Sequence, residues 1–112
     1  MHIIFLSKKL SKLCNNDRDL KRRYGKMASK IQFSMDDLAA ATTLGEFRTL
    51  PQHRCHELKE NRKGQLAIDL LHPNRLVFEP ADDPPAKKAD GGIDWNNVKV
   101  IRIIEITNYH RE

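Results

Sequence analysis

The stretch QLAIDLLHPNRLVFE, residues 65–79, decides the fold of this chain. Its two apolar runs, 65–71 and 75–79, are short and rich in residues that favour strands. His72, Pro73 and Asn74 separate the runs, and such a short connection of turn-forming residues joins antiparallel neighbours. The stretch therefore predicts a β-hairpin.

Three further segments, 3–6, 54–59 and 98–107, have the composition of strands. The last is apolar on both of its faces, which predicts a central strand. A short connection containing Glu60 and Gly64 follows segment 54–59 and predicts a second hairpin. The sheet is therefore expected to be mostly antiparallel.

The region 17–42 predicts one long N-terminal helix. Asn16 is a suitable N-cap, and Asp19 follows where acidic side chains favour the positive helix terminus. Gly25 lies inside this helix at a cost of about 1 kcal/mol relative to alanine. Ser34 and Asp37 form a capping pair, which leaves a break there open. The apolar stripe recurs at steps of three or four residues: Leu20, Tyr24, Met27, Ile31, Met35 and Leu38.

A second capping pair, Thr43 and Glu46, predicts a short helical turn before the sheet. Residues 81–96 are polar and contain two prolines and two glycines, so we expect a mobile surface loop. Trp95 either anchors that loop or faces a partner. Together these elements predict a single α+β domain spanning 1–112, with the helices packed on one face of the sheet.

The composition is that of an ordinary folded domain: 112 residues, of which 39% are hydrophobic and 31% charged. The apolar stretch 3–6 meets Lys8 and Lys9 almost at once, so it predicts neither a signal peptide nor a membrane span. Cys14 and Cys55 are too few for a disulfide framework and form no CxxC pair. These features favour a cytoplasmic protein with no membrane partner.

The net charge of +5 favours a polyanionic partner, and the charge is concentrated in the N-terminal third. Through Lys30 the chain has nine lysines and arginines against two aspartates. This basic region is either a solvated helix face or a surface that follows nucleic-acid phosphates, and both interpretations stay open.

Two histidines at the ends of expected strands suit RNA cleavage. Histidine has an unperturbed pKa near neutrality, so His56 and His110 are candidates for a general base that takes the 2'-hydroxyl proton and a general acid that protonates the departing 5'-oxygen. The residues alone do not say which is which. Taken singly, each histidine is equally explained as a surface residue or a hydrogen-bonded core residue.

Cations near these histidines are candidates for binding the scissile phosphate. Arginine can bind two phosphate oxygens, whereas lysine acts as a point charge. Lys63 is equally explained as a solvated residue of a hairpin turn. Tyr109 either stacks on a base or is a half-buried sheet aromatic. The RNA-binding candidates are Arg54, Lys59, Arg62, Lys63 and Arg75.

The sequence predicts neither a metal nor a cofactor. It has no HExxH motif, no phosphate-binding glycine loop and no Cys/His spacing typical of zinc. His53, His56 and His72 do not form a convincing set of ligands.

Three blocks resemble a known family: CHELKENRKG at 55–64, NRLVFE at 74–79 and ITNYH at 106–110. In order and spacing they are similar to the RelE/HigB-like toxins of type II toxin-antitoxin systems, and most closely to the HigB, or plasmid maintenance killer, branch. The resemblance covers most of the chain. It implies a fold of the RelE-like microbial ribonuclease type and an mRNA endoribonuclease that acts on the ribosome without a metal.

The resemblance also implies roles for individual residues. The family's HxLK motif falls on His56, Leu58 and Lys59, and its terminal Tyr-His falls on Tyr109 and His110. The preceding residue, often Asp in HigB proteins, is Asn108 here, and an amide can orient a histidine but cannot take a proton at neutral pH. The remaining family positions are the basic turn at Arg62 and Lys63 and the strand arginine at Arg75.

The implied partners are the ribosome with its mRNA and a cognate helix-turn-helix antitoxin similar to HigA. Both the long helix and the 81–96 loop are candidate surfaces for the antitoxin. Two alternatives stay open: a noncatalytic RNA- or ribosome-binding module, and a subunit whose main role is operon autoregulation in an antitoxin complex.

Overall fold

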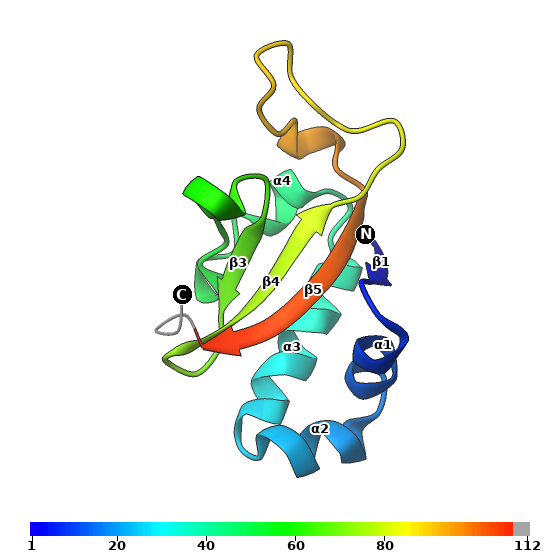
Figure 1. Cartoon of the computed structure of the whole chain (residues 1–112), viewed down its shortest axis with the longest axis vertical. Coiled ribbons are helices and arrows are strands. Elements are labelled where there is room, and N and C mark those ends of the chain that lie inside the picture. Colours follow the sequence, from blue (N-terminus) through cyan, green and yellow to red (C-terminus); the bar gives the residue numbers. More distant parts are fainter. Residues whose placement is uncertain (109–112) are drawn as a thin grey trace.

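A computed structural model describes residues 1–108 and confirms an α+β fold (Figure 1). Its sheet has five strands in the order β1-β5-β4-β3-β2, and β1 is parallel to β5. The other pairs are antiparallel, including the hairpin expected at 65–79. The strands are β1 His2–Phe5, β2 His56–Glu57, β3 Leu66–Asp69, β4 Asn74–Pro80 and β5 Val100–Asn108.

The prediction of one long helix over 17–42 is wrong, because the chain breaks at Gly25. Gly25 has φ 55° and ψ −124°, a conformation that only glycine adopts readily, and it ends one helix and turns the chain into the next. Ser34 and Asp37 cause no break, since both lie inside the following helix. The helices are α1 Lys8–Cys14, α2 Asp17–Tyr24, α3 Met27–Ala40 and α4 Leu44–Phe47.

Three helix starts have the side-chain caps that define a helix N-terminus. The expected caps are confirmed: the Asn16 side chain accepts from the Asp19 N–H at 3.1 Å, and the Thr43 hydroxyl accepts from the Glu46 N–H at 3.2 Å. Helix α1 was not expected from the sequence. Its cap is Ser7, whose hydroxyl accepts from the Leu10 N–H at 3.1 Å.

The core lies between the helices and one face of the sheet, as expected. Figure 1 shows α3 behind β5, and the sheet contributes alternate residues of β3, β4 and β5 to the core. Strand β5 lies between β1 and β4 and is therefore not an edge strand, but the central strand of the five is β4 and not β5 as predicted. Fully buried members of the core include Leu20, Ile31, Leu38, Leu44, Phe47, Leu66, Ile68, Leu76, Phe78, Ile101 and Ile103.

The loop after β4 projects from one end of the molecule (Figure 1) and is tied down at its base. The Arg48 guanidinium lies 4.0 Å from the Trp95 ring centre, so Trp95 anchors the loop to the region of α4. The Asp82 carboxylate accepts from the Lys99 N–H at 2.9 Å. The loop also contains one isolated β-bridge, between Lys87 and Ile93.

Three short 3-10 helices connect the main elements. The 3-10 helices are η1 Pro51–His53, η2 Glu60–Arg62 and η3 Trp95–Asn97.

Within residues 1–108, no helix is both long and apolar enough to cross a membrane.

Candidate functional site

The sheet face opposite the helices carries several of the predicted site residues. The register pairs His56 with Ala67, Ala67 with Val77, and Val77 with Glu105. Directly paired residues project on the same face of a sheet, so His56 and Glu105 mark the two ends of one row across four strands. We call this surface the outer face.

A second row of the outer face lies two residues further along the strands. It contains Asp69, Arg75 and Thr107, which the register pairs across β3, β4 and β5. Residues two apart on a strand share a face, so Arg75 lies on the same side as His56. Arg75 is only 8% exposed, so its side chain is largely buried.

Arg62 reaches from η2 to the far side of the outer face. Its guanidinium binds the Glu105 carboxylate at 2.6 Å and the Gln65 side-chain oxygen at 2.9 Å. An ion pair that is partly exposed adds little to stability. The ion pair instead determines where the Arg62 guanidinium lies, which is at the Glu105 end of the row that contains His56.

The His56 ring is oriented by the backbone. Its Nδ1 lies 2.7 Å from the Arg54 carbonyl oxygen, and because a carbonyl only accepts, Nδ1 must carry the proton. In the neutral ring the lone pair is then on Nε2, the nitrogen that a general base would use. The side chain is half-buried, in agreement with its place at the sheet edge.

Arg54 also belongs to this region. Its Nε donates to the Asp69 carboxylate at 2.6 Å, which links the segment before β2 to the second row. The register therefore places His56 and Arg75 on the same face, and the ion pair with Glu105 holds the Arg62 guanidinium at that face, with Arg54 at its border.

The other predicted residues are placed differently. Lys59 and Lys63 are exposed at the two ends of η2. Asn108 pairs with Asn74, and its position along β5 puts it on the alternate side from Thr107. Tyr109 and His110 lie outside the described residues, so the proposed pairing of His56 with His110 stays a prediction.

Glu105 and Asp69 are the site residues that the sequence analysis missed. Each is a single carboxylate within an apolar strand segment, and each holds an arginine of the predicted set. The available signal was an acidic residue within a strand whose other residues are apolar. The arginine that each acid binds could be recognised only from the three-dimensional structure.

Cys55 precedes His56 but is not an alternative nucleophile. Burial raises the pKa of its thiol to about 12, an effect that Arg48 opposes and Glu57 reinforces. Burial likewise raises the pKa of Cys14 to about 11. Both thiols are protonated at neutral pH, and the thiolate is the nucleophilic form.

His53 is a core residue and not part of the outer face. It is fully buried, its Nε2 lies 2.6 Å from the Asp37 carboxylate, and its ring stacks on Phe47 at 5.1 Å. Within residues 1–108 no three His, Cys, Asp or Glu side chains are grouped in a way that could hold a metal ion.

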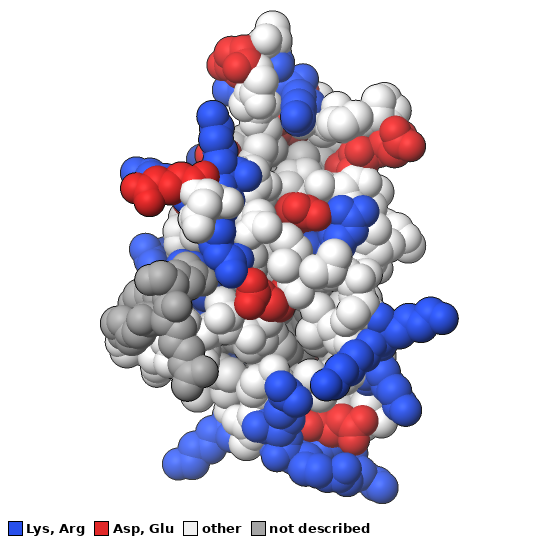
Figure 2. Space-filling model, in the orientation of Figure 1, with Lys and Arg blue, Asp and Glu red and all other residues white. Residues whose placement is uncertain are grey.

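The predicted basic region is a surface of α1 and α2. Figure 2 shows Lys and Arg side chains gathered at the end of the molecule where Figure 1 places α2. A hollow of about 480 Å³ between the two helices is lined partly by cations. We call the following lining residues the basic hollow: Lys9, Lys12, Leu13, Asp19, Arg22 and Arg23.

Comparisons with known proteins add no relative. No model of a known protein family matches the chain, and no curated protein matches it.

Proposed function

We propose that this protein is a ribosome-dependent mRNA endoribonuclease, the toxin of a type II toxin-antitoxin pair. The observation that carries the proposal is the outer face, where a histidine with Nε2 as its basic nitrogen lies on the same side of the sheet as the buried Arg75 and as Arg62, which is bound to Glu105. The resemblance of blocks 55–64, 74–79 and 106–110 to RelE/HigB-like toxins supports the same proposal.

In this proposal the 2'-hydroxyl of one nucleotide attacks the adjacent phosphorus. One histidine, His56 or His110, takes the hydroxyl proton, and the other protonates the 5'-oxygen as the P–O5' bond breaks. Arg75 and Arg62 stabilise the negative charge that develops on the phosphate oxygens. The products are a 2',3'-cyclic phosphate and a 5'-hydroxyl, and no metal enters the reaction.

The remaining predicted residues supply binding. Lys59 and Lys63 are exposed beside the outer face and can contact the RNA backbone as mobile point charges. Tyr109 would stack on a base, which is worth about 1 to 3 kcal/mol. Asn108 would orient His110 where many HigB proteins use a carboxylate.

The test is cleavage of mRNA on programmed ribosomes in the presence of EDTA, with both new RNA ends mapped. The wild-type chain should cut only ribosome-bound mRNA and leave 5'-hydroxyl ends. His56→Ala and His110→Ala should each lose cleavage, whereas His2→Ala, an exposed histidine of β1, is the matched control and should cut normally. Ends bearing a 5'-phosphate would reject the mechanism.

A second candidate function is a noncatalytic RNA- or ribosome-binding module. The basic hollow favours it, because surface cations bind phosphates without any chemistry. Ribosome binding by the wild-type chain without cleavage, unchanged in both histidine variants, would select this alternative.

A further inference from the structure

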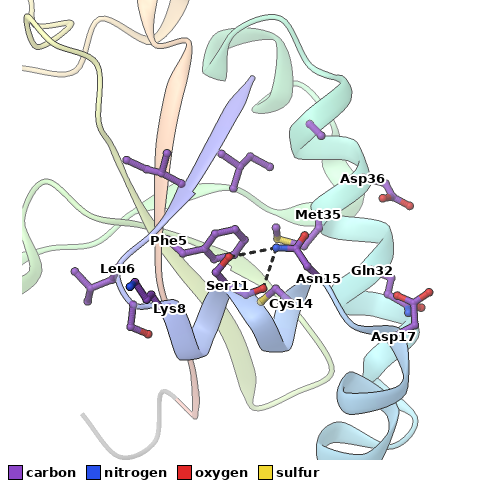
Figure 3. A pocket seen from close by; sticks show the side chains of 14 residues that line it. Phe5, Leu6, Lys8, Ser11, Cys14, Asn15, Asp17, Gln32, Met35 and Asp36 are labelled. Atoms are coloured by element: carbon purple, nitrogen blue, oxygen red, sulfur yellow. Dashed lines mark hydrogen bonds between the residues drawn. The ribbon is translucent and has the colours of Figure 1, made fainter.

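Another hollow lies along β1, away from the outer face. It has a volume of about 920 Å³ and is bordered by β1, α1 and α3 (Figure 3). Residues 3–8 all line it, so the hollow follows the edge of the strand and not only one of its faces. Among the residues that the structure describes, none of the predicted RNA-cleaving or RNA-binding residues lines it. We call it the β1 groove.

Among the strands of the described residues, β1 has a neighbour on one side only. It is the first strand of the sheet, and its backbone pairs with β5, with the His2 N–H donating to the Lys99 carbonyl and the Leu6 N–H to the Ile103 carbonyl, both at 2.9 Å. Backbone groups alternate in direction along a strand, so the N–H groups of Ile3 and Phe5 point away from β5. Both residues line the groove.

Apolar side chains form part of the groove lining. Phe5, Cys14 and Met35 line it from β1, α1 and α3, and Figure 3 shows their side chains close together. Beside them the Asn15 side-chain amide donates to the Ser11 carbonyl at 2.8 Å. This apolar part of the lining suits one apolar side chain.

The charge of the groove is opposite in sign to that of the whole chain. Its charged lining residues are Asp17, Asp36 and Lys8, which makes the groove net acidic in a chain of net charge +5. Asp17 and Asp36 are exposed and lie on the helical side of the groove (Figure 3). This sign disfavours a nucleic acid and favours a ligand that carries a cation.

We propose that the β1 groove binds an extended peptide segment of a partner protein, which adds to the sheet as a strand beside β1. The backbone of the segment pairs with Ile3 and Phe5, one apolar side chain lies over Phe5 and Met35, and a Lys or Arg faces Asp17 and Asp36. In strand addition the backbone supplies affinity and side-chain pockets supply specificity. The inference does not depend on RNA cleavage.

The length of β1 sets the length of the segment. β1 has four residues, so about four to six residues of the partner would pair with it at roughly 3.3 Å per residue. Leu6, at the end of β1, is 61% exposed and offers additional apolar contact on the other side of the added strand.

The experiment uses a phage-displayed library of 12-residue peptides selected on the full-length protein. A synthetic form of the best peptide is then titrated into the ¹⁵N-labelled protein. We expect sequences that combine an apolar residue with Lys or Arg, and we expect the Ile3 and Phe5 amides to become protected from hydrogen exchange. An absence of binding peptides, or peptides that leave both amides unprotected, would overturn the proposal.

A single backbone atom provides the sharpest variant. Cys14 permits ligation of synthetic residues 1–13 to residues 14–112 with no change of sequence, so Phe5 can carry an N-methyl group in place of its N–H. This change should weaken the peptide at least tenfold relative to the unmethylated ligated chain. Equal affinity of the two chains would contradict strand addition.

A charge variant keeps the test informative if the methylated chain does not fold. Asp36→Lys should weaken the peptide about tenfold, whereas Asp90→Lys, an exposed aspartate of the loop after β4, should leave its affinity unchanged. Equal losses in both variants would mean a nonspecific charge effect. Self-association of the chain through β1, detected by sedimentation, would replace the proposed partner with a second copy and overturn it.

Discussion

The outer face of the sheet and the surface of α1 and α2 both carry cations, but they hold them differently. On the outer face, Arg54 binds Asp69 and Arg62 binds Glu105, each at 2.6 Å. On the surface of α1 and α2, one ion pair is found among the described residues. It joins the Asp19 carboxylate to the Arg22 guanidinium at 3.6 Å, and the Arg22 side chain is 72% exposed.

The difference separates two uses of positive charge. A guanidinium held by a carboxylate has a defined position, which a reaction requires. Solvated cations attract a polyanion over a longer range and lose their effect as salt rises. The outer face therefore suits chemistry, and the helical surface suits attachment.

The largest effect is expected at Arg75. If the outer face holds the scissile phosphate, Arg75→Ala should lower the single-turnover cleavage rate on ribosomes by about 10²- to 10³-fold, the usual loss of a preorganised donor. Arg75→Lys should restore only part of the rate, because lysine cannot bind two oxygens at once. Arg18→Ala, an exposed residue of α2, is the control. An equal loss of rate in Arg18→Ala would erase the distinction between the two surfaces.

The basic hollow should control how strongly the affinity of the chain for RNA depends on salt concentration. Replacing Lys9, Lys12, Arg22 and Arg23 with alanine should reduce the slope of log affinity against log salt by roughly 3 if all four contact phosphates. Cleavage at saturating ribosome concentration should not change. Filter binding between 50 and 200 mM salt, about the range over which such slopes are measured, checks this. The control is Lys87→Ala with Lys88→Ala, both exposed at the opposite end. A slope that does not change would move RNA attachment to another surface.

Gly25 determines how the helical surface is joined to the rest of the fold. Gly25→Ala should lower the free energy of unfolding by about 1 to 3 kcal/mol, because alanine is strained in this backbone conformation. No atom lies within 4 Å of the added Cβ, so the loss would come from the backbone alone. A continuous helix would give the opposite sign, a gain of about 1 kcal/mol. Denaturant unfolding distinguishes a loss from a gain in the free energy of unfolding. The control is Ser29→Ala, at an exposed position of α3.

The chain contains two thiols whose pKa is raised by burial, Cys14 in α1 and Cys55 before β2. A raised pKa means that the folded state retains the proton longer than the unfolded state, so stability is complete below about pH 9 and falls towards pH 12. Cys55→Ala should reduce that slope by at most about 1.4 kcal/mol per pH unit. Unfolding curves from pH 8 to 11 for this variant and Cys14→Ala measure both contributions. An unchanged slope for Cys55→Ala would mean that Cys55 titrates normally in the folded chain.

The sheet and its hairpins were accessible to sequence analysis because their signals are local. The run 65–79 carries its own turn, and its register follows from it. The caps at Asn16 and Thr43 were predicted for the same reason, since each needs only residues within one turn. Helix α1 was missed, although Ser7 caps it in the same way.

The sequence by itself determined the α+β class, the hairpins, the concentration of basic residues and the candidate cations of an RNA site. Only the tertiary structure decided that Gly25 breaks the helix, that Glu105 and Asp69 hold the arginines of the outer face, and that an acidic groove follows the edge of β1. The physical reason is range. Periodicity and caps act within a few residues, whereas an ion pair between Arg62 and Glu105 or a groove between β1 and α3 depends on how distant segments are placed by packing.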